Sequence, residues 1–158
     1  MSRILTLAQQ NRKEGKRFVK FMVVGAIGFV VDAAVFNICA HVFHLPQLLA
    51  QTFSFAAAIV SNFTWNRYWT YPDSRSKPIR RQLVQFTVVN LIGYAIRTVV
   101  FTLVGAPYLQ LVTAQPLVPL NGDTAKFIAG NLTLGTAVVT VLLWNFFVNR
   151  YWTYNDVS

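Results

Sequence analysis

One hexapeptide, Asn-Arg-Tyr-Trp-Thr-Tyr, occurs twice in the chain, at residues 66–71 and 149–154. Each copy places an amide, a guanidinium and three aromatic rings within six residues. A guanidinium forms paired hydrogen bonds to phosphate oxygens, and an amide adds a neutral donor beside it. The two copies therefore favour binding of a phosphate group.

The neighbouring asparagines extend this pattern along a predicted helix. Asn62, Asn66 and Trp69 are spaced i, i+4 and i+7, which places them on one helix face. Lys20 and the N-terminal ends of two predicted helices add positive potential. The alternative interpretation is an ordinary aromatic belt with cytoplasmic arginines. The predicted phosphate-binding residues are Arg67, Arg150, Asn66, Asn149, Asn62, Asn145, Lys20, Trp69 and Trp152.

Two charged residues lie near the middle of apolar runs. Asp32 and Arg97 occupy equivalent positions, each about eleven residues past the start of a repeated segment, so both are expected roughly 16 Å deep, near the midplane of a ~30 Å hydrocarbon core. An ion pair between them, within one chain or between two protomers, offsets the cost of a lone charge there. With Asn90 they line a polar path through the membrane, or they only fix helix packing.

The elements that position these residues are four long apolar runs. Of 158 residues, 54% are hydrophobic and 12% are charged, about half the charge of a typical soluble domain. The runs cover about 18–43, 48–64, 83–104 and 126–148, and each approaches or exceeds the length that crosses a bilayer. The sequence predicts an all-α membrane protein with four transmembrane helices, and a turn-rich connection over 105–124.

The distribution of Lys and Arg predicts the topology. The net charge is +9, which by itself is also typical of nucleic-acid-binding proteins, but the basic residues cluster before the first run and after the second. Cytoplasmic segments retain Lys and Arg, so both termini are expected in the cytoplasm, with a multi-pass location in the cell's inner (cytoplasmic) membrane. Anionic lipids, not nucleic acid, are the expected partners of the basic clusters.

The duplication also covers the odd-numbered runs, because residues 21–28 match residues 86–93. An even number of crossings separates the copies, which predicts two parallel-repeat helical hairpins. We expect a basic cytoplasmic segment over 1–17, either a short interfacial helix or a mobile stretch. A single transmembrane domain over 18–158 follows, with repeats at about 18–71 and 83–154.

Enzymatic activity is not expected. The five acidic residues are scattered, and no nucleophile stands at a spacing that would pair it with a base. Neither histidine has companions at metal-ligand spacing. The sequence predicts no catalytic residue, no metal site and no cofactor.

The opening Phe-x-Lys-Phe-x-x-Val-Gly-x-x-Gly-Phe-x-x-Asp at residues 18–32 and the repeated Asn-Phe-x-x-Asn-Arg-Tyr-Trp-Thr-Tyr resemble the GtrA-like family from Phe18 to Tyr154. This resemblance implies flipping of a polyprenyl-phosphate-linked sugar across the cytoplasmic membrane for cell-surface polysaccharide or teichoic-acid glycosylation.

Two other functions stay open. The first is a non-transporting scaffold for a membrane glycosyltransferase, because similar domains are attached to polyprenyl-phosphate glycosyltransferases. The second is a proton-coupled exporter in which Asp32 carries the proton. Arg97 argues against this function, because a nearby cation would keep the Asp32 carboxylate ionised. Four short spans enclose little space, which also favours a homo-oligomer.

Overall fold

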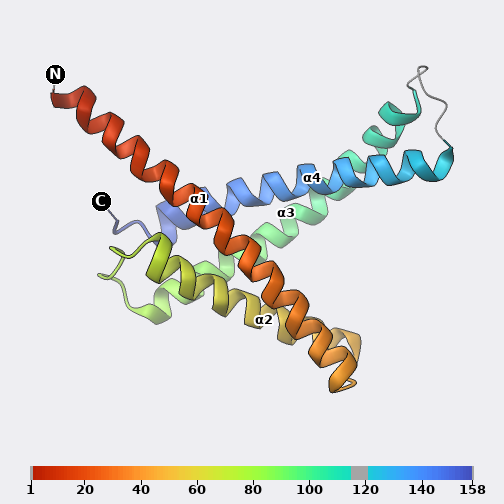
Figure 1. The fold of residues 1–158 in the computed structure, drawn as a ribbon, viewed down its shortest axis with the longest axis horizontal. Coiled ribbons are helices and arrows are strands. Elements are labelled where there is room, and N and C mark those ends of the chain that lie inside the picture. The colour runs from red at the N-terminus through yellow and green to blue at the C-terminus, as the bar shows by residue number, and fades with distance from the viewer. Residues whose placement is uncertain (1, 115–120, 158) are drawn as a thin grey trace. The chain divides into compact units, whose positions relative to one another are not determined.

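The computed structural model describes residues 2–114 and 121–157. The described part is all helical, with α1 (Ser2–Asn37), α2 (Gln47–Trp65), α3 (Ile79–Thr113) and α4 (Gly122–Val148) (Figure 1). Three short π-helical turns extend them: η1 (Ile38–Val42), η2 (Asn66–Thr70) and η3 (Asn149–Thr153). The predicted all-α class with four long helices is confirmed.

Three helical stretches among the described residues are long and apolar enough to cross a membrane: Asn11–Val42, Ile79–Thr113 and Gly122–Thr153. The fourth expected span, α2, has 19 residues and is not one of the three, so its crossing stays a prediction. Many large apolar side chains lie on the helix surfaces, among them Phe29, Leu48 and Phe127. Such exposure is unfavourable in water but suits contact with lipid, and it fits a multi-pass membrane protein.

Residues 2–17 form a longer helix than the prediction allowed for. From Ser2 onward, α1 runs into the first apolar run without a break, so residues 2–17 are the start of a long helix and not a short separate one. Leu, Ala, Gln, Arg, Lys and Glu fill it, and these residues favour a helix. Helical periodicity thus continues where the apolar pattern has stopped.

The predicted turn-rich connection over 105–124 is also mostly wrong. Pro107 lies inside α3, which continues to Thr113, and α4 begins at Gly122; residues 115–120 lie outside the described residues. Val112 packs with Ala125 and Ala129 in a small apolar cluster. An internal proline costs a helix roughly 3 kcal/mol, and packing contacts such as these favour the helical form. Asn121 caps α4 by accepting a hydrogen bond from the Thr124 amide at 2.7 Å.

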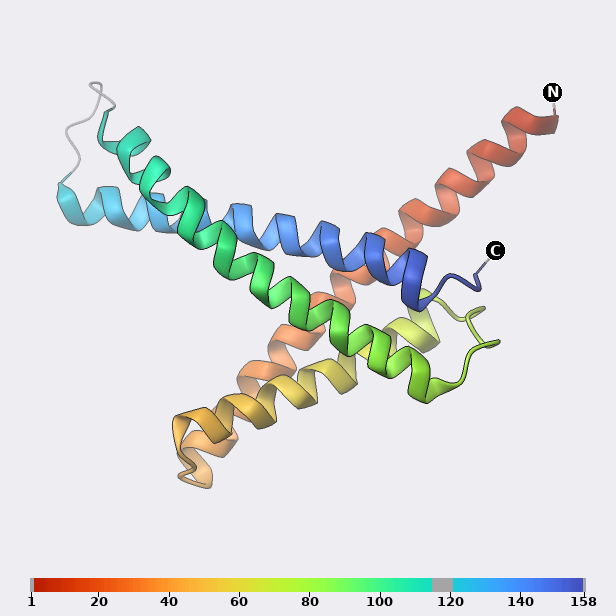
Figure 2. The ribbon, with the colours of Figure 1, turned by 180° about the vertical axis from the view of Figure 1, so that it is seen from behind.

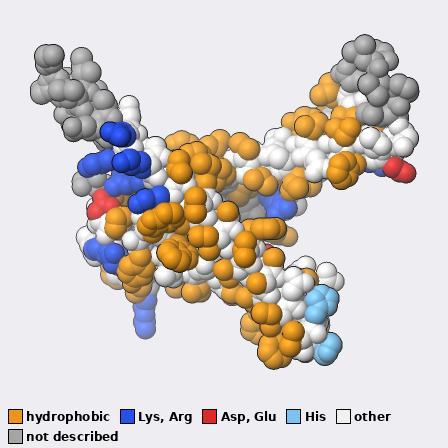
Figure 3. All heavy atoms as spheres, in the orientation of Figure 1, with side chains coloured by type: hydrophobic (Ala, Val, Ile, Leu, Met, Phe, Trp, Pro, Cys, Tyr) orange, Lys and Arg blue, Asp and Glu red, His pale blue; other side chains and the backbone are white. Residues whose placement is uncertain are grey.

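The chain divides into two compact units. The first comprises Met1–Thr87 and Arg150–Ser158, and the second comprises Val88–Asn149. In the first unit α1 and α2 form a helical hairpin, which both views of the ribbon show side by side (Figures 1 and 2). Lys and Arg side chains gather over the N-terminal half of α1 and the segment after η2, whereas the two histidines lie near the α1–α2 turn (Figure 3). This separation suits the predicted topology.

Candidate functional site

Both copies of the hexapeptide form the same π-helical turn. η2 and η3 each comprise Asn-Arg-Tyr-Trp-Thr, and the first is closed by a 2.8 Å hydrogen bond from the Tyr71 amide to the Asn66 carbonyl. A π turn is rare and is frequently found at functional sites, although η1 forms one outside the hexapeptides. Identical sequence thus produces an identical and unusual local structure at two places in the chain.

The π turn interrupts the predicted stripe of asparagines and tryptophan. Asn66 and Asn149 are buried, but the indoles of Trp69 and Trp152 are 37% and 42% exposed. The wider turn changes which side chains share a face, so the i, i+4, i+7 spacing no longer places each indole over the buried amide. The roles of both tryptophans in phosphate binding stay predictions.

One buried guanidinium has nitrogen atoms without hydrogen-bond partners among the described residues. Arg67 is 7% exposed, and its Nε and Nη1 atoms have no hydrogen-bond partner among the described residues. The buried Asn66 Oδ1 and Thr70 Oγ1 atoms of the same turn also lack partners in the described part of the chain. A buried charge without a partner of opposite charge destabilises a protein by several kcal/mol. The guanidinium nitrogens of Arg67 are donors that an anion would satisfy, whereas Asn66 Oδ1 is an acceptor and would need a donor instead.

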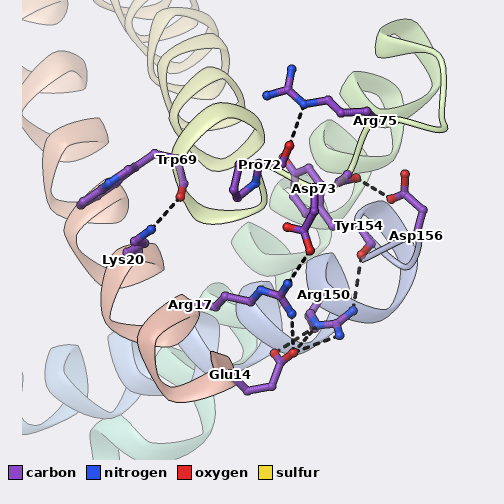
Figure 4. A network of polar contacts seen from close by, with 11 residues as sticks. Glu14, Arg17, Lys20, Trp69, Pro72, Asp73, Arg75, Arg150, Tyr154 and Asp156 are labelled. Carbon is purple, nitrogen blue, oxygen red and sulfur yellow. Dashed lines mark hydrogen bonds and ion pairs between the residues drawn. The ribbon is translucent and has the colours of Figure 1, made fainter. Parts of the chain in front are cut away.

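The second copy is already occupied by a carboxylate. Glu14 accepts hydrogen bonds at 3.0 Å from Nε and Nη2 of Arg150 and at 2.6 Å from Arg17 (Figure 4). Arg17 also pairs with Asp73 at 2.8 Å. The chain Arg150–Glu14–Arg17–Asp73 ties α1 to both hexapeptides. Arg67 and Arg150 are equivalent in sequence but differ in their partners.

Each hairpin brings an asparagine against a glycine. In the first unit, a Cβ atom on Gly28 would overlap the Asn62 amide; in the second, a Cβ on Gly93 would lie 2.9 Å from Asn145 Oδ1. Both Oδ1 atoms are buried and have no hydrogen-bond partner among the residues that the structure describes. The same pair of residue types thus leaves a bare acceptor oxygen at matching places in the two repeats.

Lysines hold the carbonyl ends of both turns. Lys20 donates to the Trp69 carbonyl at 3.1 Å and lies 5.4 Å from the centre of its ring. Lys77 donates to the carbonyls of Trp152 and Thr153 at 2.8 and 3.2 Å. A cation near unpaired helix-end carbonyls is favourable. Lys20 therefore contacts the first copy, while its binding of phosphate stays a prediction.

Sequence reasoning missed Lys77, Glu14 and a repeated aspartate. Asp73 and Asp156 each follow a hexapeptide by two residues. Aligning the two repeats beyond the hexapeptides would have shown this identity. Asp156 accepts hydrogen bonds from the hydroxyls of Ser74 and Ser76. Burial raises the pKa of Asp156, but these hydrogen bonds lower the pKa by a larger amount. The net pKa therefore lies below its ordinary value.

The residues predicted to lie within the membrane belong to different units. Asp32 is partly exposed on α1, in the first unit; Asn90 is partly exposed and Arg97 exposed on α3, in the second. The Arg97 guanidinium lies 5.7 Å from the centre of the Phe101 ring. The ion pair and the polar path stay predictions. No cluster of three or more potential metal ligands occurs within the described ranges.

Comparison with known proteins identifies a family over most of the chain. The family model described as "GtrA/DPMS, transmembrane domain" matches residues 20–154. The chain is 26% identical over 156 residues to the uncharacterized membrane protein YngA of Bacillus subtilis, covering 98% of this chain and 87% of that protein. It is also 29% identical over 85 residues to a dolichol-phosphate mannosyltransferase of Pyrococcus furiosus, covering 54% of this chain and 24% of that longer protein.

Proposed function

The chain belongs to the GtrA/DPMS transmembrane domain family, and we propose that it flips a polyprenyl-phosphate-linked sugar across the cytoplasmic membrane for cell-surface glycan modification. The lipid phosphate binds at the hexapeptide turns on the cytoplasmic side. The family assignment supports the class of substrate, because the family is linked to polyprenyl-linked sugars in general. The residue roles rest on the geometry of the site.

The buried guanidinium of Arg67 is the observation that carries this proposal. Its Nε and Nη1 atoms lie within the protein without partners in the described chain. Charge-assisted hydrogen bonds to a phosphate are stronger than neutral ones. A phosphate would supply both the missing negative charge and the missing acceptors, so the first hexapeptide is the primary phosphate contact.

The glycine–asparagine pairs suit the rest of such a lipid. Asn62 Oδ1 and Asn145 Oδ1 are buried acceptors without partners among the described residues, and each lies four residues before a hexapeptide on the helix that leads into it. Sugar hydroxyls are donors that would match these oxygens. A polar group moving from the phosphate site along α2 or α4 meets an acceptor about one helical turn away.

Translocation of a labelled polyprenyl-phosphate sugar tests the function directly. The purified protein is placed in vesicles, and the labelled lipid exposed in each leaflet is followed with a membrane-impermeant modifying reagent. We expect exchange between leaflets at least tenfold faster than in protein-free vesicles. Exchange at the protein-free rate, in protein that still binds the lipid, would contradict a flippase.

The second candidate is a non-transporting partner of a membrane glycosyltransferase. It is favoured by the match to part of a dolichol-phosphate mannosyltransferase. In that protein a segment related to this chain belongs to the same polypeptide as a mannosyltransferase. In that case the hexapeptides hold the lipid carrier for the transferase. Co-purification of a transferase, together with lipid binding and no exchange in vesicles, would support this function over flipping.

A further inference from the structure

We infer that a basic pocket at the side of α1 binds a phosphate group; its lining does not include Arg67. The ligand is either the headgroup of an anionic lipid or a water-soluble phosphate, which share the same chemistry. The pocket shares Lys20 with the predicted phosphate-binding set, but Lys13, Lys16 and Arg17 lie outside that set, so this inference can be tested whether or not the protein flips lipids. The lining side chains come from the N-terminal half of α1 and from the segment that follows α2.

The pocket has a volume of about 170 Å³. That volume is below the 300–1,000 Å³ that is usual for sites of drug-sized ligands, so a compact group fits and a nucleotide does not. It is lined by Lys13, Lys16, Arg17, Lys20, Thr70, Pro72 and Asp73. Four of these residues are cationic and one is acidic.

The positive charge of the pocket is not balanced by the protein. The single lining carboxylate, Asp73, already accepts a hydrogen bond from Arg17, and Arg17 also pairs with Glu14. Lys20 donates to a neutral carbonyl. Lys13 and Lys16 are exposed and make no hydrogen bond or ion pair with the described residues. The lysine charges in this pocket therefore remain available to an anion.

The spacing of these lysines is unfavourable without a ligand. Lys13, Lys16 and Lys20 follow one another at i+3 and i+4 on α1, where like charges repel by a few tenths of a kcal/mol per pair. An anion between their ammonium groups converts that repulsion into attraction. Ammonium groups are compact donors that bind phosphate as point charges.

A hydroxyl in the pocket points to the same ligand independently. Thr70 lines the pocket, is 1% exposed, and its Oγ1 atom has no hydrogen-bond partner within the described chain. A buried hydroxyl without a partner is costly. A phosphate oxygen held by the lysines would accept its hydrogen bond. Three lysines and one hydroxyl then provide more than one donor for a tetrahedral oxyanion.

Binding measurements separate the two sources of phosphate. The full chain is placed in nanodiscs of neutral phosphatidylcholine and titrated with inorganic pyrophosphate by isothermal calorimetry. In a second arm, the protein in detergent is titrated with mixed micelles containing phosphatidylglycerol. Saturable binding in the first arm identifies the phosphate group alone as the ligand, whereas binding only in the second identifies a lipid headgroup.

Two variants that remove equal charge test whether the phosphate binds in this pocket. Lys13→Gln/Lys16→Gln removes two charges from the pocket, and Arg80→Gln/Arg81→Gln removes two exposed charges that do not line it. We expect Kd to rise at least tenfold in the first variant and less than twofold in the second. Thr70→Val is expected to raise Kd several-fold, while Thr153→Val in the second hexapeptide is not.

Three results would overturn the inference: equal effects of the two double variants, no effect of either, or no saturable binding in either arm. Arg67→Gln should leave this binding unchanged, which distinguishes failure here from failure of the proposed flippase site. Circular dichroism confirms that each variant keeps its helix content. The two lysines are exposed, so their replacement is not expected to unfold α1.

Discussion

Tyr71 and Tyr154, the last residues of the two hexapeptides, stack on each other with ring centres 4.4 Å apart and planes inclined by 16°. Both side chains are fully buried. Residues 83 positions apart in the sequence thus meet in the first unit, and the two copies share a contact. Burial raises the pKa of each hydroxyl above its ordinary value, so both tyrosines are neutral at physiological pH.

This stack predicts a large effect of truncation and a small effect of removing the hydroxyl. Tyr71→Ala or Tyr154→Ala should lower the free energy of unfolding by about 3–5 kcal/mol, because a large buried ring is lost. Tyr71→Phe should change it by less than about 1 kcal/mol, since the buried hydroxyl has no hydrogen-bond partner in the described structure. Thermal unfolding in detergent measures both. A phenylalanine variant as unstable as the alanine variant would contradict the described packing.

The glycine–asparagine contact predicts a position-specific effect of a methyl group. Gly28→Ala should destabilise the α1–α2 hairpin by about 1–3 kcal/mol, because the new Cβ overlaps the Asn62 amide. Gly25→Ala is the matched control, since nothing lies within 4 Å of its Cβ position. The double variant Gly28→Ala/Asn62→Ala should recover part of the loss. Equal unfolding temperatures for the two single variants would show that the helices do not approach there.

The ion-pair chain predicts that Glu14 anchors α1. Glu14→Gln should cost roughly 1–2 kcal/mol, since charge-assisted bonds to Arg150 and Arg17 are lost, discounted for the partial exposure of Glu14. Arg12→Gln, on the exposed surface of the same helix, should have no measurable effect. Chemical unfolding followed by circular dichroism compares the two. A Glu14 variant as stable as the Arg12 variant would contradict the anchoring role.

The carboxylate of Asp156 predicts a loss of stability in acid. Hydrogen bonds from Ser74 and Ser76 hold its pKa below the ordinary 3.8, although burial acts in the opposite direction. A depressed carboxyl pKa contributes stability that is fully present above its ordinary pKa and is lost as the pH falls through the lower, folded-state value. Unfolding temperatures of the wild type and Asp156→Asn should differ at pH 7 and converge in acid. If the two unfolding temperatures still differ at low pH, the ionised Asp156 carboxylate is not the cause of the difference.

The helices were predictable because membrane spans need long apolar runs, and these runs stand out from polar segments. Their ends were less so. The polar start of α1 is helical because of backbone preference, which hydropathy does not report. Pro107 suggested a turn, but it lies inside α3, whose end packs through Val112 against Ala125 and Ala129. Such contacts depend on how two helices meet.

The hexapeptides were found as a repeat, and their residue types indicated phosphate chemistry. The π turn was not predictable, because the choice between two backbone bonding patterns leaves no mark in side-chain periodicity. The inequality of Arg67 and Arg150 was also hidden. It arises from Glu14, which lies in a segment that the sequence placed outside the transmembrane domain and which contacts Arg150 only after folding.

The exchange rate of a labelled polyprenyl-phosphate sugar in vesicles containing Arg67→Gln tests the central claim most directly. The matched control is Arg75→Gln, an exposed arginine of the same unit that lies beside the Tyr68 ring. Loss of charge-assisted bonds worth about 1.5–3 kcal/mol should slow exchange at limiting lipid by roughly tenfold to a hundredfold, while the control keeps the wild-type rate. If Arg67→Gln moves the lipid as fast as the control, the first hexapeptide is not the phosphate site.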